Sequence, residues 1–212
     1  MATHHGNPEP VAIAILAKAP LPGLAKTRLA PALGPDGAAA LAARFIERAV
    51  ATAKAAAIGP VALWVTPDRH HSAFQMVSAL LDVGLKEQPE GDVGARMLAA
   101  IAATEGPAIV IGTDCPALAP EHLRAAGEAL RDGVDAVVIP VEDGGYALIG
   151  MRRAEPDLFA GISWSTDAVT AQTRCRLARL GLSWREPARL WDVDVPADLE
   201  RLNRAGLASL MQ

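Results

Sequence analysis

Short apolar runs rich in β-branched residues alternate along this chain with alanine-rich stretches of helical spacing. Residues 11–16 are apolar at every position, as expected of a parallel strand that is buried on both faces. A helical stripe follows at Leu41, Phe45 and Ala49, and the alternation continues to the end of the chain. This pattern predicts an α/β protein of three layers (α/β/α), in which helices cover both faces of a mostly parallel central sheet.

The same pattern predicts where the individual elements lie. We expect strands at 11–16, 61–66, 83–86, 107–111, 134–140, 146–149 and 189–193. We expect helices at 36–57 with Asp36 as its N-cap, at 72–81, after Asp92, at 120–131, at 166–180 and after Pro196.

Composition narrows the class of protein. A chain of 212 residues that is 51% hydrophobic is long enough to bury a core without disulfides or a structural metal. The formal net charge of −4 argues against a protein that coats nucleic acid, and two distant cysteines give neither a disulfide scaffold nor a zinc pattern. The apolar run 11–17 is far shorter than the about 20 residues of a membrane span. We therefore expect a cytoplasmic protein with a disordered leader at 1–10 and one domain at 11–212.

Polar, glycine-bearing loops follow the predicted strands at their carboxyl ends. In open α/β sheets, ligands bind beyond these ends. The candidate segments are 18–34, 91–96, 112–116 and 141–146, together with Asp192 and Asp194 near the last expected strand.

The first of these loops, 18–34, concentrates positive charge. Lys18, Lys26 and Arg28 lie beside prolines and Gly23, directly after the first strand. Three cations at a strand end suit a diphosphate or triphosphate, because each ionised contact is a charge-assisted hydrogen bond. The glycine patterns of a Walker loop and of a dinucleotide fingerprint are absent, and the alternative is an ordinary solvated loop.

Carboxylates follow two other strands. Asp114 stands at the tip of an apolar strand, where it is suited to hold Mg²⁺ or Mn²⁺, although it could instead cap a turn. Strand alternation would put Asp192 and Asp194 on one face, so that one of them completes the metal site. Helix capping by Asp194 is the alternative.

A glycine turn and two further segments complete the candidates. Gly144 and Gly145 would let backbone N–H groups approach a ligand, and Asp143 could accept from a hydroxyl or deprotonate it, although a plain hairpin turn explains the same residues. Arg96 would bind an anion near a helix N-terminus. Trp164 would flank an acceptor site.

Together these segments resemble a known family. Five motifs in order, over about residues 11–203, are similar to the small bacterial GT-A-type glycosyltransferases that are associated with arsenosugar biosynthesis and radical-SAM enzymes. The motifs are Ala17-Lys18-x-Pro-x-Pro-Gly-x-x-Lys26-Thr27-Arg28-Leu29, Gly91-Asp92-x-Gly-x-Arg-Met97, Gly112-Thr113-Asp114-x-Pro116, Asp143-Gly-Gly-Tyr146-x-Leu-Ile-Gly150 and Asp192-x-Asp194-x-Pro196-x-Asp-Leu199.

The resemblance implies a nucleotide-diphospho-sugar transferase fold and a metal-dependent glycosyltransferase that acts on a small-molecule acceptor. It places the nucleotide and its phosphates on the first loop, and a divalent ion, Mg²⁺ or Mn²⁺, near Asp114. The predicted roles are nucleotide binding by Lys18, Gly23, Lys26, Arg28 and Arg96, metal binding by Asp114 and Asp194, base catalysis by Asp143, and contact with the sugar or acceptor by Gly144, Gly145, Tyr146 and Trp164.

Two alternative functions remain open at this point. The first loop also resembles that of the phospholactate guanylyltransferases, which implies nucleotidyl transfer from a nucleoside triphosphate with release of pyrophosphate. A non-catalytic nucleotide-binding protein that kept the fold is the other alternative.

Overall fold

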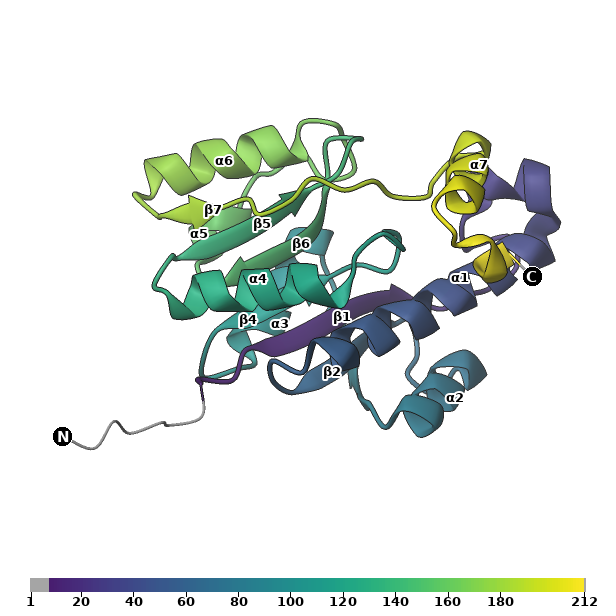
Figure 1. The fold of residues 1–212 in the computed structure, drawn as a ribbon, viewed down its shortest axis with the longest axis horizontal. Helices are drawn as coiled ribbons and strands as arrows, with labels where there is room; N and C mark the ends of the chain where they lie inside the picture. Colours follow the sequence, from purple (N-terminus) through teal and green to yellow (C-terminus); the bar gives the residue numbers. More distant parts are fainter. Residues whose placement is uncertain (1–7, 212) are drawn as a thin grey trace.

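A single sheet forms the centre of the molecule (Figure 1). The structure is a computed structural model that describes residues 8–211, so most of the predicted leader lies outside the described residues. Within that range the strand order is β3-β2-β1-β4-β6-β5-β7. The strands are β1 (Ala12–Lys18), β2 (Val61–Thr66), β3 (Gly84–Glu87), β4 (Ala108–Ile111), β5 (Ala136–Pro140), β6 (Tyr146–Met151) and β7 (Trp184–Arg185).

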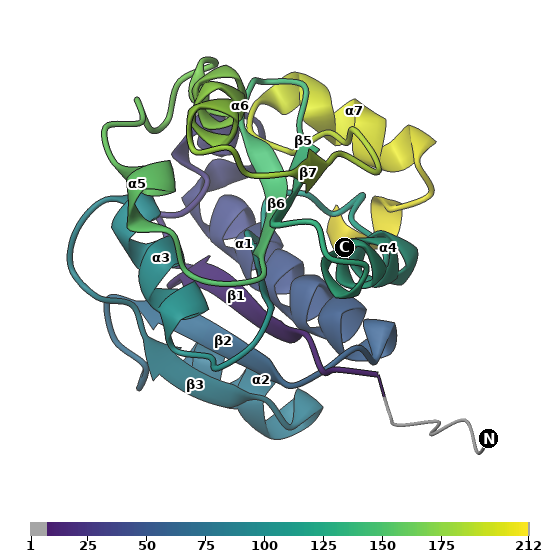
Figure 2. The same cartoon turned by 90° about the vertical axis from the view of Figure 1, so that its left-hand side faces the viewer.

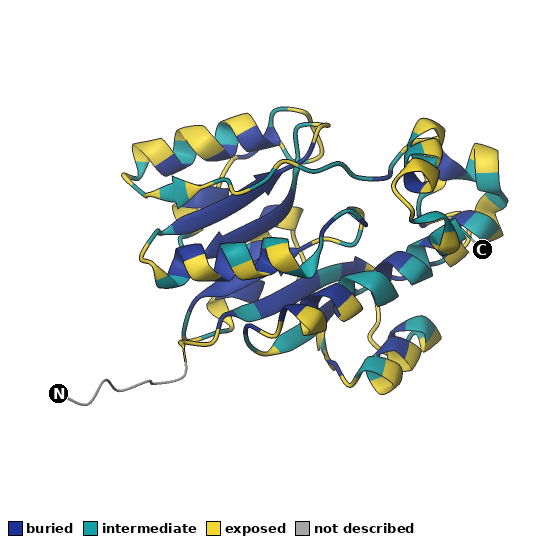
Figure 3. Cartoon of the chain, in the orientation of Figure 1, coloured by how far each residue is buried: buried dark blue, intermediate teal, exposed yellow. Residues whose placement is uncertain are grey.

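The sheet is mostly parallel, as the sequence predicts. Only β6 runs antiparallel to its neighbours, β4 and β5, while the other described pairs are parallel. The inner strands β2, β1, β4, β6 and β5 are mostly buried, whereas the edge strands β3 and β7 and the outer faces of the helices are more exposed (Figure 3). Burial on both faces explains why the strand sequences are continuous apolar runs.

Helices cover both faces of the sheet (Figure 2). One buried cluster joins the sheet to α1 (Ala30–Ala56), α2 (Ser72–Leu81) and α4 (Pro120–Arg131). Another joins the opposite face to α3 (Val93–Ala102), α5 (Pro156–Phe159) and α6 (Val169–Arg179). The three-layer prediction is therefore confirmed. Within the described residues, no helix is both long and apolar enough to cross a bilayer.

The last part of the chain returns to the first loop. From β7 an extended segment runs to α7 (Pro196–Arg204), which is followed by η2 (Ala208–Met211) (Figure 1). On its way Val193 donates its N–H to the Asp114 carbonyl at 2.9 Å. Its side chain is fully buried in a cluster with Leu29 and Phe45. This crossing brings residues 191–195 beside the carboxyl ends of β1 and β4.

Several expected elements differ from those observed. The first helix begins earlier, at Ala30, and is kinked at Gly34 (φ 72°) before Pro35, so that Asp36 lies exposed inside the helix and is not its N-cap. The expected strand at 189–193 does not form beyond a bridge at Leu190, because the chain then leaves β5 and Val193 gives its N–H to the Asp114 carbonyl.

A turn between β5 and β6 is fastened to the start of α6. Thr170 donates its N–H to the Gly144 carbonyl at 2.9 Å and its hydroxyl to the Gly145 carbonyl at 2.6 Å. Gly144 has a φ of 94°, and a Cβ on it would collide with the backbone of Asp167. Glycine is thus required at position 144 for two reasons, its backbone conformation and its close packing against Asp167.

We predict that Gly144→Ala lowers the free energy of unfolding by about 2–4 kcal/mol, since a left-handed alanine and a steric clash act together. The matched control is Gly181→Ala, because Gly181 has a φ of 66° but no atom within 4 Å of the added Cβ. That variant is expected to lose only about 1 kcal/mol. Urea denaturation measures both, and equal losses would show that the turn is not held against α6.

Candidate functional site

A cavity of about 830 Å³ opens at the carboxyl edge of the sheet. Its size is within the range of small-molecule sites. Most of the predicted site residues line it, namely Lys18, Lys26, Arg28, Arg96, Asp114, Asp143, Gly145, Tyr146, Trp164 and Asp194, whereas Gly23 and Gly144 are not among the lining residues.

Lys26 is the centre of the polar wall of this cavity. Its Nζ lies 2.7 Å from Asp114 Oδ1 and 3.1 Å from Asp194 Oδ1, and donates to the Val193 carbonyl at 2.6 Å. The side chain is only 7% exposed, and its ammonium lies 5.8 Å from the centroid of the Phe45 ring. The backbone is left-handed (φ 46°), a conformation that costs a non-glycine residue about 1–2 kcal/mol. These contacts offset that cost and join three segments of the chain.

Asp194 is held from both sides. Its Oδ1 contacts Lys26 and its Oδ2 lies 3.3 Å from Arg28 Nη1. Capping of α7 is performed by Asp198, whose Oδ2 accepts from the backbone N–H groups of Asp194 and Val195 at 2.8 and 2.9 Å. The alternative of Asp194 as a helix cap is therefore wrong.

Asp114 does not cap the following helix, α4. The N-terminus of α4 is closed by His122, whose Nδ1 accepts from the Ala119 N–H at 3.0 Å. The carboxylate of Asp114 is half exposed and pairs with Lys26.

Two more carboxylates, those of Asp192 and Asp143, line the same cavity as Asp114 and Asp194. Burial raises the pKa of Asp192 to about 6, and the nearby carboxylates of Asp143 and Asp194 add to this effect. Lys26 lowers the pKa by a smaller amount. Although no strand forms here, Asp192 and Asp194 both line the cavity while Val193 between them is buried. Asp143 lines it too, and its Oδ1 accepts from the Gly145 N–H at 2.9 Å.

The donor chemistry of this wall fits a hard divalent cation, because several carboxylates face one cavity and carry more negative charge than Lys26 compensates. Among residues 8–211, however, no three acidic, histidine or cysteine side chains form a ready metal-binding group. A metal at Asp114 and Asp194 would have to take the place of the Lys26 ammonium.

The predicted ligand contacts of the glycine turn need correction. The N–H groups that were expected to be free are used inside the turn: Gly144 donates to the Val141 carbonyl at 3.3 Å and Gly145 to Asp143 Oδ1 at 2.9 Å. The Tyr146 hydroxyl is buried, and burial raises its pKa. Tyr146 lines the cavity, and its ring packs edge-on against Trp164 with the ring centroids 6.5 Å apart.

Trp164 is seated against α3. A Cβ on Gly94 would overlap the Trp164 indole, so this glycine makes room for the ring beneath the N-terminus of the helix. Asp92 caps α3 by accepting from the Ala95 N–H at 2.8 Å, as the sequence predicts. The cavity wall formed by Trp164 therefore depends on a glycine inside a helix.

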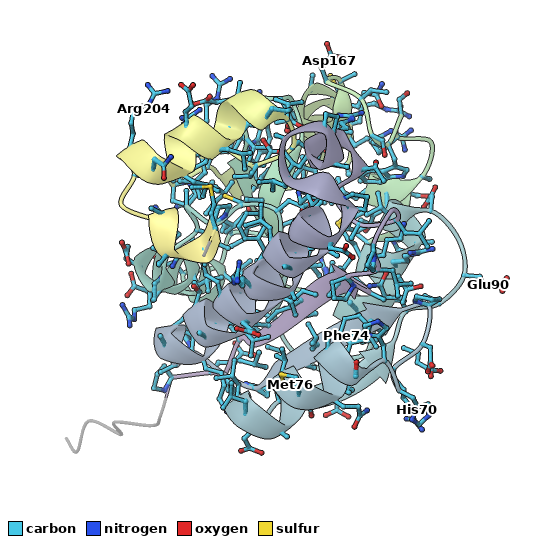
Figure 4. The ribbon with its side chains drawn as sticks, turned by 90° about the vertical axis from the view of Figure 1, so that its right-hand side faces the viewer. His70, Phe74, Met76, Glu90, Asp167 and Arg204 are labelled. Atoms are coloured by element: carbon cyan, nitrogen blue, oxygen red, sulfur yellow. The ribbon has the colours of Figure 1, made fainter. Side chains whose placement is uncertain are left out.

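The histidines and Cys115 are the other candidate nucleophiles and bases, and neither type is suited to catalysis in this cavity. No histidine in the described residues lines the cavity, and His70 points outward beside α2 (Figure 4). Burial raises the pKa of the Cys115 thiol to about 12, so it stays protonated at neutral pH. The titratable chemistry of this cavity is thus that of its carboxylates, lysines and arginines.

Sequence reasoning missed Gln88, which lines the cavity after β3 and accepts from Arg96 Nη1 at 3.2 Å. No motif signals it, because its partners are backbone carbonyls of distant strands.

We predict that Lys26→Met lowers the free energy of unfolding by about 1–3 kcal/mol, since two half-exposed carboxylates lose their shared cation. Urea denaturation at neutral pH measures the change. The control is Lys18→Met, because Lys18 is exposed and its one hydrogen bond within residues 8–211 is to the Leu24 carbonyl at 3.4 Å. Equal free energies of unfolding for the two variants would show that the pairing of Lys26 with Asp114 and Asp194 does not stabilise the fold.

Comparisons with known proteins agree with this fold. A family model described as "Uncharacterized protein conserved in bacteria (DUF2064)" matches residues 49–166. No curated protein matches the chain at a significant level.

Among solved structures, the chain is similar to a protein from Desulfovibrio desulfuricans G20 that carries a provisional assignment as a nucleotide-diphospho-sugar transferase. The two share 29% identity with a TM-score of 0.83, over 92% of this chain and 87% of that one.

More distant structures share the fold alone. One is 4-diphosphocytidyl-2C-methyl-D-erythritol synthase from Anaerococcus prevotii DSM 20548, with 11% identity and a TM-score of 0.59 over 96% of this chain and 97% of that one. Another is glucosyl-3-phosphoglycerate synthase from Mycobacterium tuberculosis, in complex with Mn²⁺, UDP and glucosyl-3-phosphoglycerate. It has 11% identity and a TM-score of 0.54, over 95% of this chain and 78% of that one.

Proposed function

The chain belongs to the DUF2064 family, and we propose that it is a nucleotide-dependent transferase that moves a sugar from a nucleotide-diphospho-sugar to a small-molecule acceptor. We take residues 11–212 as its single catalytic domain. One observation carries the proposal: Lys26 and Arg28 meet the carboxylates of Asp114 and Asp194 in one cavity at the carboxyl edge of the sheet. Transfer of a sugar from a nucleotide-diphospho-sugar needs cations that bind the phosphates and oxygen ligands that bind a metal ion.

In this proposal the first loop binds the diphosphate of the donor. Arg28 is 72% exposed, so that it can turn from Asp194 toward a ligand, and Lys18 and Arg96 line the same cavity. Lys26 is already inside it and exchanges its carboxylate partners for phosphate oxygens. The binding of phosphate thus frees Asp114 and Asp194.

The freed carboxylates would hold Mg²⁺ or Mn²⁺, with Asp192 beside them. When bound, the ion supplies compensation for the negative charge that develops on the leaving nucleoside diphosphate. The chain's own contribution is to keep the carboxylates facing one cavity: Val193 anchors the crossing segment by its buried side chain and by its hydrogen bond to Asp114.

Asp143 is the proposed base. Its Oδ1 is fixed by the Gly145 N–H, which orients the carboxylate and leaves Oδ2 to take a proton from an acceptor hydroxyl. Trp164 and the ring of Tyr146 supply an apolar wall next to it on which a sugar ring can pack. Gly144 and Gly145 serve this site by holding the turn in place.

Nucleotidyl transfer remains the second candidate. A cation-rich loop directly after β1 would serve a triphosphate as well as a diphosphate, and the fold is shared with the 4-diphosphocytidyl-2C-methyl-D-erythritol synthase named above. In that case a phosphorylated substrate would attack the α-phosphate and pyrophosphate would leave.

The released product tests the proposal. Wild-type protein with Mg²⁺ or Mn²⁺ is incubated with UDP-, GDP-, ADP- and CDP-sugars together with a set of small hydroxyl-bearing acceptors. In parallel it is incubated with the four nucleoside triphosphates and small phosphorylated acids. We predict release of nucleoside diphosphate from a nucleotide sugar. Pyrophosphate release from a triphosphate would overturn sugar transfer in favour of the second candidate, and nucleotide binding without turnover would leave a non-catalytic binding protein.

A variant pair locates the base. Asp143→Asn is expected to lower kcat about 100-fold or more with little change in donor KM, because a base acts in the chemical step. Asp132→Asn is the control, since Asp132 lies outside the cavity and pairs with Arg185 on the surface. A wild-type kcat for Asp143→Asn would remove Asp143 from the mechanism.

Metal binding should depend on the diphosphate, because Lys26 pairs with both proposed ligands. We predict that Mn²⁺ alone binds weakly and that UDP, GDP, CDP or ADP strengthens its binding to the protein by about 10-fold or more. Electron paramagnetic resonance of free Mn²⁺ measures this, after correction for the nucleotide's own affinity for the ion. The same Mn²⁺ affinity with and without nucleotide would contradict the exchange of partners at Lys26.

A further inference from the structure

Gln88 ties together the ends of two central strands. Its backbone N–H donates to the Val65 carbonyl at 2.9 Å, which extends the pairing of β3 with β2 by one residue. Its side-chain Nε2 donates to the carbonyls of Ala17 and Trp64 at 3.0 and 2.8 Å. Both N–H bonds of the amide are therefore used by β1 and β2.

These bonds decide which way the amide points. The inverted amide would bring Oε1 against two carbonyl oxygens, so Oε1 must be the atom that remains for another partner. That partner is Arg96, whose Nη1 donates to Oε1 at 3.2 Å. The orientation of the acceptor is thus set by the sheet itself.

Arg96 is held at a second point. Its Nε donates to the Gly91 carbonyl at 3.2 Å, in the loop before α3. Two of its three guanidinium nitrogens are fixed in this way, and the described residues provide no hydrogen-bond partner for Nη2. Arg96 and Gln88 both line the cavity.

We infer that Gln88 is a positioning residue that holds the Arg96 guanidinium in the cavity wall, so that its unfixed edge meets phosphate oxygens of the nucleotide in one orientation. This inference rests on the proposed function, because the ligand is the nucleotide of the transferase. It deepens that proposal by adding a residue that no sequence motif indicates. A long arginine side chain loses rotamer freedom when it binds, and fixing it beforehand removes part of that cost.

A double-mutant cycle tests the inference. Dissociation constants for UDP, GDP, CDP and ADP are measured by calorimetry for wild type, Gln88→Met, Arg96→Met and the double variant. We expect each single change to weaken binding about 10-fold, and the double variant to bind as weakly as Arg96→Met alone, because Gln88 acts through Arg96. The control is Gln75→Met, since Gln75 is an exposed glutamine of α2 that bonds only the Arg69 carbonyl, and it should bind as wild type does.

Losses that add in the double variant, or wild-type affinity in Gln88→Met, would overturn the inference. Gln88→Asn, which is too short to span both strands and Arg96, replaces Gln88→Met in the cycle if that variant fails to fold.

Nuclear magnetic resonance of the ligand-free protein separates this inference from the proposed function. The Arg96 Nε–H signal, assigned by its loss in Arg96→Met, should be sharp in wild type and should broaden or exchange rapidly in Gln88→Met. An unchanged signal overturns the inference even if no nucleotide binds, while failure of wild type to bind any nucleotide counts against the proposed function alone.

Discussion

The arrangement of the site depends on the Lys26 ammonium, which connects three segments of the chain. It lies within 3.1 Å of carboxylates from two different segments and also binds the carbonyl of Val193. A buried ammonium needs such partners, because an unpaired charge in that position would cost several kcal/mol of desolvation. The crossing of the chain between β7 and α7, the position of β4 and the left-handed turn of the first loop are all tied to one side chain.

The same arrangement connects structure to chemistry. Lys26 now compensates the carboxylates that a metal would need, and it is also a cation that phosphate would attract. In the proposed function, phosphate would replace the carboxylates as the partner of Lys26, and a metal ion would replace Lys26 as the partner of the carboxylates. The pKa of Asp192 is raised first by burial and then by the neighbouring Asp143 carboxylate, which adds to the negative charge of this wall.

Local patterns predicted much of this fold. The boundaries of β2, α2 and α4 match the sequence prediction residue for residue, because apolar spacing and clear stop signals define them. The sequence also singles out Lys26, Arg28 and Asp114, which line the cavity, since they are charged residues in loops that follow buried strands. The features that the sequence did not predict depend on contacts between residues that are distant in sequence. The pairing of Lys26 with Asp194 comes from the crossing of the chain, the role of Gln88 from two backbone carbonyls, and the need for Gly144 from the backbone of Asp167.

In the proposed function this cavity binds a nucleotide through its cations and carboxylates together. The most direct test of this binding is the thermal unfolding temperature of the wild-type protein with nucleoside diphosphates, nucleoside triphosphates and nucleotide sugars, each with and without Mn²⁺. A ligand that binds only the folded state raises this temperature. We predict a rise with at least one nucleotide that is larger when Mn²⁺ is present. No shift with any nucleotide, with or without the ion, would contradict the account.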